Sequence, residues 1–443
     1  MNDTGGRSFG TEAALLTAAR FVTVAALFVV QVLAARVLGP EALAAAAVGQ
    51  TIGMIAALVA NGGLNIAAIY YLQRARDDRA TLVPRLSALL IAACAVSIVI
   101  VVAVGPAVVG WAVGEDDPSL VIGAAGFAAA MIAFEVAGAV LLGLGRSASF
   151  TRMELTRGIG SLLAVGVLLL GPWSTAPGFV VGLALGYALA AALGLLATGR
   201  AGVALMPRFD AQFSRAALGF GLRGQVGNVL QFLGVRLDLL IVPALVDLRA
   251  AGIYVVAVRT SDVVGQVATA ASSLVFPRVA GQQDSHSTDF TERATRMTLV
   301  AVAMPAVLIA VAAEPILRLL FGEVYAAGTN ALVILLVAMV PLSLTRIVAA
   351  DLKGRGRPGL VSWASLLSAV ATVCLDLLLV PQLGIVGAAI ASLLAYTIGA
   401  AAILLMYRSA TAARLGALVP TLADLRDLVQ SGAAVARAGR RTG

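Results

Sequence analysis

Charged and amide side chains lie inside long apolar segments of this sequence. The segment 217–243 contains Arg223, Gln225, Asn228, Gln231, Arg236 and Asp238. The next apolar segment, 250–276, contains Arg259 and Asp262 three residues apart, a spacing that places both on one face of a helix. At the centre of a bilayer, Arg or Asp costs about 2.5–3.5 kcal/mol on insertion scales. If these segments cross a membrane, their charges must face protein, water or a bound polar group.

The first half of the chain contains a sparser set of the same kind. Its members are Arg20, Gln50, Asn61, Asn65 and Glu135. Arg20 and Glu135 are both expected in the cytoplasmic half of the bilayer.

Two interpretations of the buried charges stay open. In the first, they are structural ion pairs between or along helices: Arg259 with Asp262, Arg20 with Glu135, and Arg236 with Asp238. In the second, they line a hydrated cavity that receives an anionic group. The predicted spans contain five arginines and four acids: Arg20, Arg223, Arg236, Arg259 and Arg346, with Glu135, Asp238, Asp262 and Asp376. Arginine suits phosphate because its planar fork donates two hydrogen bonds and keeps its proton.

No motif of the sequence predicts catalysis or a metal site. There is no Gly-rich phosphate loop, HExxH or GxSxG, and the two cysteines, Cys94 and Cys374, stand alone in apolar segments. We therefore predict a protein that is not an enzyme and holds no metal or organic cofactor. A coupling proton or sodium ion stays open.

The composition requires that these residues be held by membrane-spanning helices. Of 443 residues, 60% are hydrophobic and only 12% are charged, whereas soluble domains have about 45–50% and 25%. A helix crosses a bilayer with about 20 apolar residues. The predicted spans are 14–37, 43–70, 86–110, 119–143, 158–174, 177–198, 217–243, 250–276, 297–320, 327–350, 360–380 and 384–406.

The basic residues predict the orientation of these twelve spans. One side of the membrane receives 23 of the 31 Lys and Arg residues and the other side only 3, namely Arg36, Arg249 and Arg318. Since basic loops favour the cytoplasm, both termini are predicted to be cytoplasmic, in a multi-pass protein of the cell membrane. The net charge of +8 is thereby explained as an orientation signal, and a nucleic-acid partner is excluded.

An internal repeat relates the two halves at an offset of 209 residues. Leu168-Leu169-Leu170 and Pro172 correspond to Leu377-Leu378-Leu379 and Pro381, and Tyr187 corresponds to Tyr396. Six spans per half give both halves the same orientation, so a pseudo-two-fold axis along the membrane normal is expected. The predicted domains are a six-helix lobe at 1–200, a cytoplasmic linker at 201–216, a second lobe at 217–406, and a basic cytoplasmic tail at 407–443.

Several short stretches resemble a known family of membrane proteins. They are Ala35-Arg36-Val37-Leu38-Gly39-Pro40-Glu41, Arg236-Leu237-Asp238, Ala251-Gly252-Ile253-Tyr254-Val255-Val256-Ala257, Val275-Phe276-Pro277-Arg278-Val279, Leu320-Phe321-Gly322-Glu323-Val324-Tyr325 and Val380-Pro381-Gln382-Leu383-Gly384-Ile385-Val386-Gly387-Ala388-Ala389-Ile390-Ala391. Together they are similar to the polysaccharide or oligosaccharide flippases, the group of the O-antigen flippases. Their superfamily also includes the multidrug and toxic compound extrusion transporters and the lipid II flippases. Ala44 stands where members of the family often have Gly.

The resemblance implies export of a polyprenyl-diphosphate-linked glycan to the outer leaflet, by alternating access through a cationic lumen between two lobes. On this hypothesis the diphosphate is bound in turn by Arg20, Arg223, Arg236 and Arg259. The supporting polar, ion-pair or coupling residues are Glu135, Asp238, Asp262, Asn228, Gln231, Gln50, Asn61 and Asn65. The partners are then the lipid bilayer, the lipid-linked glycan and proteins of polysaccharide assembly.

Three other functions compete with this one. A cation-coupled multidrug antiporter of the same fold should have a net acidic cavity, whereas the spans contain five arginines against four acids. A membrane glycan polymerase or ligase should carry a large outer loop with catalytic residues, and the outer connections are short. An architectural scaffold does not require so much buried polarity.

Overall fold

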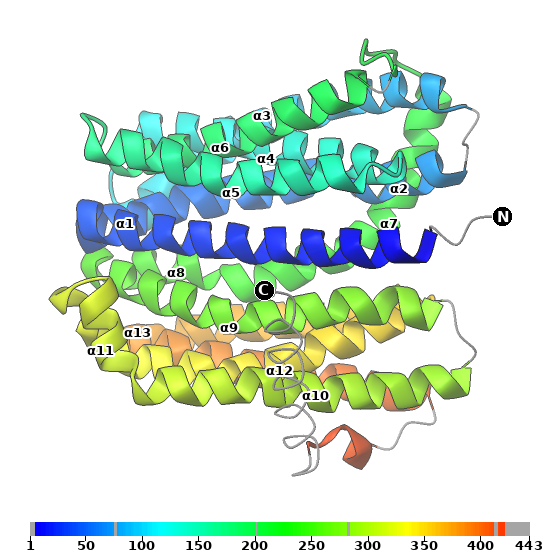
Figure 1. The fold of residues 1–443 in the computed structure, drawn as a ribbon. Helices are drawn as coiled ribbons and strands as arrows, with labels where there is room; N and C mark the ends of the chain where they lie inside the picture. Colours follow the sequence, from blue (N-terminus) through cyan, green and yellow to red (C-terminus); the bar gives the residue numbers. More distant parts are fainter. Residues whose placement is uncertain (1–4, 75–77, 201, 281–283, 412–414, 421–443) are drawn as a thin grey trace, which may run out of the picture. The chain divides into compact units, whose positions relative to one another are not determined.

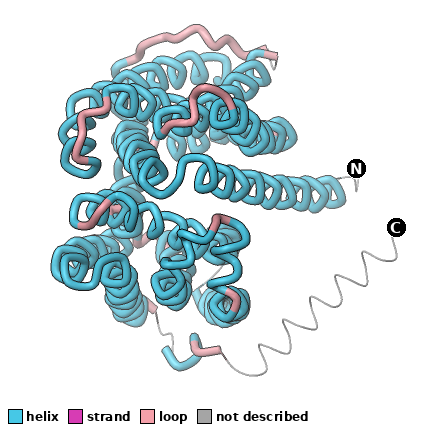
Figure 2. The backbone as a smooth tube through the Cα atoms, turned by 90° about the vertical axis from the view of Figure 1, so that its left-hand side faces the viewer, coloured by secondary structure: helices cyan, strands magenta, loops and turns pink. Residues whose placement is uncertain are grey.

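The structure is a computed structural model that describes residues 5–74, 78–200, 202–280, 284–411 and 415–420. Nearly all of these residues are helical, and none of them forms a strand (Figure 2). The all-α class predicted from the sequence is therefore confirmed. Most of the predicted basic tail, 421–443, lies outside the described residues.

By its internal contacts the chain divides into two compact units. Unit 1 comprises Met1–Val229 and Asp247–Val255, and unit 2 comprises Leu230–Val246 and Val256–Gly443. The complete helices of unit 1 are α1 (Gly5–Asn61), α2 (Leu64–Arg74), α3 (Arg79–Val113), α4 (Pro118–Gly143), α5 (Ser147–Leu170) and α6 (Ala176–Gly199) (Figure 1). Within unit 1, α4, α5 and α6 pack against one another and against α1.

Unit 2 shares two helices with unit 1 and adds its own. The shared helices are α7 (Ala211–Arg236) and α9 (Leu248–Ala280). The complete elements of unit 2 are α8 (Asp238–Leu245), α10 (Asp284–Val311), α11 (Ala313–Leu320), η2 (Glu323–Gly328), α12 (Thr329–Gly354), α13 (Pro358–Ala410) and η3 (Leu415–Leu418). In this unit α12 packs along α13 and α10, and α8 packs against α13.

Glycines interrupt the two longest helices. Gly39 divides α1 with φ 74° and ψ 176°, a backbone conformation almost restricted to glycine, and Gly384 divides α13 with φ 58° and ψ −138°. Both breaks fall where the sequence predicts that one span ends and the next begins. The predicted span 43–70 is divided between two helices. The helix α1 ends at Asn61 and α2 begins at Leu64, and between them lie Gly62 and Gly63, with φ of 53° and 78°.

Once the glycine breaks are counted, the described helices account for all twelve predicted spans. Nine segments of the described chain are long and apolar enough to cross a membrane. Two of them, Ala18–Asn61 and Pro358–Ala410, contain a break and include two predicted spans each. The helix α9 is not among the nine, and it contains four charged residues: Arg249, Arg259, Asp262 and Arg278. The chain is thus a multi-pass membrane protein.

Small residues bring α5 and α6 into close contact. A Cβ atom on Gly186 would lie 2.2 Å from the Oγ atom of Ser161, and one on Gly182 would lie 2.7 Å from the Cγ2 atom of Val165. Small residues at helix contacts let backbones approach closely in membrane proteins, where no water drives the helices together. This contact sets α5 and α6 close enough for polar side chains of the two helices to bond directly.

Candidate functional site

Arg236, the last residue of α7, forms an ion pair with Asp262 of α9. The Nη2 atom of Arg236 lies 2.8 Å from the Oδ2 atom of Asp262, and the two side chains are 15% and 18% exposed. The other terminal nitrogen of Arg236, Nη1, is buried and has no hydrogen-bond partner among the described residues. A charged donor is therefore left over inside an apolar helical unit.

Arg346 of α12 extends this cluster along α9. Its Nη1 atom donates to the backbone oxygen of Gly265 at 2.9 Å and to the Oγ1 atom of Thr269 at 3.1 Å. A Cβ atom on Gly265 would lie 3.1 Å from that nitrogen, so the glycine gives the guanidinium room to approach. Both Arg236 and Arg346 are electrostatic neighbours of Asp262.

Two buried carboxylates of unit 2 lie near each other. Asp238 is 2% exposed at the start of α8, where its Oδ1 atom accepts the backbone N–H of Leu239 at 2.8 Å. Asp376 of α13 is fully buried, and neither of its carboxylate oxygens has a hydrogen-bond partner among the described residues. Asp238 is its charged neighbour. An isolated buried carboxylate is unfavourable as an anion, so Asp376 is a candidate to carry a proton or contact a cation.

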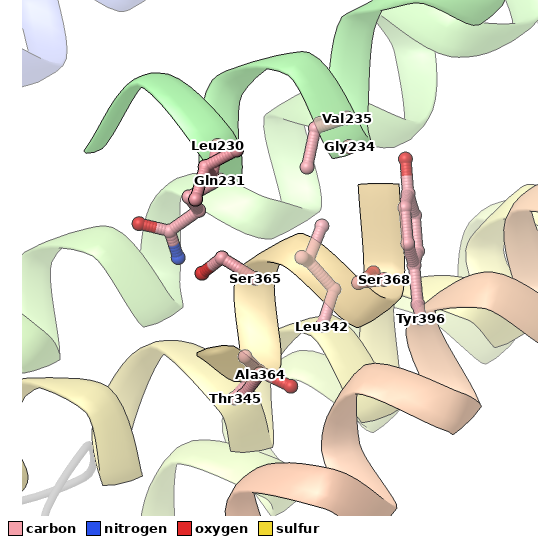
Figure 3. Close-up of a pocket in the computed structure, with 10 residues that line it drawn as sticks. All are labelled: Leu230, Gln231, Gly234, Val235, Leu342, Thr345, Ala364, Ser365, Ser368 and Tyr396. Atoms are coloured by element: carbon pink, nitrogen blue, oxygen red, sulfur yellow. The ribbon is translucent and has the colours of Figure 1, made fainter. Parts of the chain in front are cut away.

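A pocket of about 320 Å³, part of it open space, lies between α7, α12 and α13 within unit 2 (Figure 3). Its lining residues are Leu230, Gln231, Gly234, Val235, Leu342, Thr345, Ala364, Ser365, Ser368 and Tyr396. Figure 3 shows the amide of Gln231 on the same side of the pocket as the hydroxyl of Ser365. The predicted polar residue Gln231 thus lines a cavity whose other polar groups are mainly hydroxyls.

Unit 1 contains a separate charged cluster around Arg157 of α5. Its Nη2 atom lies 2.9 Å from the Oε2 atom of Glu154, one turn earlier, and its Nη1 atom donates to the Tyr187 hydroxyl of α6 at 3.0 Å. The guanidinium also lies 5.1 Å from the ring centroid of Phe134, within the range of a cation–π interaction. Thr23 of α1 donates to the backbone oxygen of Glu154 at 2.9 Å. This cluster joins four helices of one unit.

The polar residues near the end of α1 hold the turn into α2. The Nδ2 atom of Asn61 donates to the Oε2 atom of Glu135 in α4 at 2.5 Å, and the Oδ1 atom of Asn61 accepts the backbone N–H of Asn65. Gln225 of α7 donates to the backbone oxygen of Leu58 at 2.9 Å. The sequence offered Arg20 as an ion-pair partner for Glu135, but in the structure Arg20 is exposed and Glu135 accepts a hydrogen bond from the amide of Asn61.

The remaining predicted residues occupy varied positions. Arg20 and Arg223 are exposed on α1 and α7, whereas Gln50 and Arg259 are half-buried. The amide of Asn228 lies 3.4 Å from the Oε1 atom of Gln225. Whether these residues contact a substrate stays a prediction, since each unit is compact by itself and the predicted lumen lies between lobes.

Sequence reasoning missed the Arg157 cluster. The apolar runs and the basic-loop rule place Arg157 in a cytoplasmic loop, but it lies inside α5 with an 18% exposed side chain. Two signals were present: the spacing of three between Glu154 and Arg157, and the repeat that relates Tyr187 to Tyr396. In the structure both of these tyrosines have a buried arginine as a neighbour, Arg157 for Tyr187 and Arg236 for Tyr396.

The fold has clear likenesses among solved structures. A lipid II flippase MurJ in an inward closed conformation matches with a TM-score of 0.72 at 12% identity, over 94% of this chain and 90% of that one. A MATE transporter from Vibrio cholerae matches with a TM-score of 0.61 at 16% identity, over 91% of this chain and 97% of that one. At such identities these likenesses show the fold alone: the chain has the polytopic all-helical fold of these two membrane proteins.

The sequence comparisons identify the family. The profile described as "Lipid II flippase MurJ" matches residues 21–435, so the chain belongs to the MurJ family. A protein of Haloferax volcanii named "Probable low-salt glycan biosynthesis flippase Agl15" is 27% identical over 168 residues. That match covers 37% of this chain and 35% of the relative's length. The predicted resemblance to glycan flippases and lipid II flippases is confirmed.

Proposed function

We propose that the protein is a flippase that moves a polyprenyl-diphosphate-linked glycan from the inner to the outer leaflet of the cell membrane. Membership of the MurJ family supports the flippase activity, and the similarity to Agl15, a probable flippase of glycan biosynthesis, supports a glycan head group. The observation that carries the proposal within the structure is the buried guanidinium of Arg236, which keeps an unused donor beside its partner Asp262.

The physical task explains why such a donor is needed. A diphosphate and a chain of sugar hydroxyls cannot cross hydrocarbon unaided, because each buried polar group without a partner costs several kcal/mol on transfer scales. The prenyl tail, in contrast, stays in lipid throughout. The protein must therefore supply charged and hydrogen-bonding groups for the head alone.

The predicted arginines, two of the predicted amides and Asp262 have distinct roles in this mechanism. Arg20, Arg223, Arg236 and Arg259 bind the diphosphate in turn as alternating access moves the head across the membrane. The amides of Gln231 and Asn228 bind sugar hydroxyls, and the pocket of Figure 3 gives Gln231 a hydroxyl-lined site in which to do so. Asp262 orients the fork of Arg236, because one arm of the guanidinium is already fixed by the ion pair.

A coupling ion completes the cycle. Asp376 is the candidate carrier, because its two buried oxygens have no protein partner among the described residues and a second carboxylate, Asp238, lies nearby. A proton or a sodium ion on Asp376 would cancel one of the two negative charges and relieve the repulsion between the carboxylates. The termini lie in the cytoplasm, and the enzymes that assemble the glycan supply and consume its lipid-linked forms.

The test is a flipping assay with purified protein in vesicles. A fluorescent polyprenyl-diphosphate oligosaccharide is reconstituted with the protein, and its accessibility to a membrane-impermeant quencher is followed with time. We expect Arg236→Ala to lower the initial rate at least about tenfold, equivalent to about 1.4 kcal/mol of barrier. Arg318→Ala serves as the matched control, because Arg318 pairs with Glu314 in an exposed ion pair of α11.

Two results would contradict the proposal. The cationic-lumen mechanism fails if Arg236→Ala and Arg259→Ala both flip the lipid as fast as wild type. The flippase assignment itself fails if wild type leaves the lipid unmoved but extrudes a cationic dye against an ion gradient, as expected of a multidrug antiporter.

A further inference from the structure

The loop between α6 and α7 displays two large apolar side chains. Met206 is 80% exposed and Phe209 is 79% exposed, and both lie in residues 202–210, which form a loop (pink in Figure 2). The segments long enough to cross the membrane end at Gly199 and begin again at Ala211, so neither side chain belongs to a spanning helix. Exposure of this much apolar surface to water is unfavourable.

The exposure is imposed by the fold, because backbone and side-chain contacts fix the loop. The backbone N–H of Arg208 donates to the oxygen of Pro84 at 3.0 Å, and Asp210 forms an ion pair with Arg85 at 3.2 Å. The Oδ1 atom of Asp210 also accepts the backbone N–H of Phe213 at 2.9 Å, which caps the start of α7. The loop is therefore held against the beginning of α3 while Phe209 projects outward.

Exposed arginines lie close to the two apolar side chains in the sequence. Arg200 directly follows α6, Arg208 lies in the loop, and Arg215 lies near the start of α7. All three are exposed. The acid of this stretch, Asp210, is already paired with Arg85. The surface made of Met206, Phe209 and these three arginines, called here the linker surface, is therefore both apolar and positively charged.

We propose that the linker surface binds the anionic phospholipid head groups of the leaflet at which α3, α6 and α7 meet the water. The membrane-spanning helix α6 ends just before the loop, and α7 begins just after it. The loop therefore lies at head-group level, where lipid is always present. Aromatic side chains favour this zone and basic side chains favour anionic lipid. Met206 and Phe209 insert between head groups, and the arginines contact lipid phosphates. This binding is independent of the proposed transport.

Tryptophan fluorescence tests the proposal in the full-length protein. The natural tryptophans Trp111, Trp173 and Trp363 are replaced by Phe, and Phe209→Trp is introduced. In vesicles of phosphatidylcholine with phosphatidylglycerol, we expect its emission to shift to the blue and to be quenched about twofold by lipids brominated close to the head group. The quenching should weaken without phosphatidylglycerol, and it should also weaken in the double variant Arg208→Gln, Arg215→Gln.

The control places a tryptophan in a different exposed loop. Glu115→Trp lies in the acidic loop between α3 and α4, so its emission should not depend on phosphatidylglycerol. The proposal is overturned if the indole of the Phe209→Trp variant is quenched by iodide in vesicles as fully as in detergent, or if its quenching by brominated lipid ignores the lipid charge. It is also overturned if Met206→Cys reacts with a soluble maleimide in vesicles but is protected in native membranes, because a protein partner then covers the surface.

Discussion

The pair Arg157–Glu154 of unit 1 and the pair Arg236–Asp262 of unit 2 both lie inside an apolar helical bundle, and they differ in how many of their atoms are bonded. In unit 1, the Nε and Nη2 atoms of Arg157 both donate to Glu154, and its Nη1 atom donates to Tyr187. In unit 2, Arg236 donates from Nη2 to Asp262, whereas its Nη1 atom has no partner among the described residues. The first arginine is bonded on all three nitrogens and the second is not.

This difference indicates a division of work between the two clusters. A buried polar atom that makes no hydrogen bond is unfavourable by about 1–3 kcal/mol, more when it is charged, and persists where a ligand, water or ion uses it. The bonded arginine of unit 1 therefore stabilises helix packing. The incompletely bonded arginine of unit 2, together with the unpartnered carboxylate of Asp376, suits a site that exchanges partners during a transport cycle.

The largest effect is expected from removal of the bonded arginine. Arg157→Ala leaves the Glu154 carboxylate buried without its counter-ion, which destabilises a protein by about 3–5 kcal/mol. We expect a strongly lowered melting temperature in detergent, measured by differential scanning fluorimetry. Replacing both partners, Glu154→Gln with Arg157→Leu, should recover part of the loss, because no isolated charge is left. If the melting temperature of Arg157→Ala equals that of wild type, the structural role of this cluster is disproved.

A smaller loss is expected when the hydroxyl that accepts from Arg157 is removed. Tyr187→Phe deletes one hydrogen bond to a charged group, a contact that contributes about 1.5–3 kcal/mol when buried. Tyr70→Phe is the matched control, since its hydroxyl accepts a hydrogen bond from Arg74 at an exposed position. The melting temperature should fall clearly for Tyr187→Phe and hardly for Tyr70→Phe. Equal shifts in the two variants would show that burial does not strengthen the bond.

The helices were predictable from the sequence because their signal is local. Runs of about 20 apolar residues predict the spans directly, and Gly39 and Gly384 interrupt the backbone where the runs end. The helical rotation of each span is not fixed by such a run. The spacing of three therefore identifies Arg259 and Asp262 as neighbours on one helix, but it does not reveal that Arg236 of another helix reaches Asp262.

The Arg157 cluster was missed for a related reason. The rule that basic residues mark cytoplasmic loops treats an arginine near the end of an apolar run as solvated. In the structure α5 begins at Ser147, so Arg157 lies within the helix and faces Phe134 and Tyr187 of neighbouring helices. Neither the helix start nor those two aromatic neighbours can be read from the apolar run itself.

The smallest effect on stability, and the sharpest test of the comparison, is expected from Asp376→Asn. An amide has the same shape and stays neutral, and the oxygens of Asp376 have no hydrogen-bond partner among the described residues that could be lost, so the melting temperature should stay within a few degrees of wild type or rise. Stimulation of lipid flipping by a sodium or proton gradient across the vesicle membrane should be lost, because an amide can neither take up a proton nor neutralise a cation. The gradient-free rate measures the residual activity.

The two readouts of this variant separate the two kinds of buried charge. If Asp376→Asn melts as early as Arg157→Ala, the carboxylate has a structural partner, and the contrast between the units disappears. If the variant is stable but still responds to both gradients, the incompletely bonded atoms of unit 2 serve the lipid head group alone, and the ion acts elsewhere. If the incompletely bonded atoms of unit 2 exchange partners during transport, Asp376→Asn should be stable and should not respond to either gradient. A site of this kind contributes to the transport cycle and not to the stability of the resting fold.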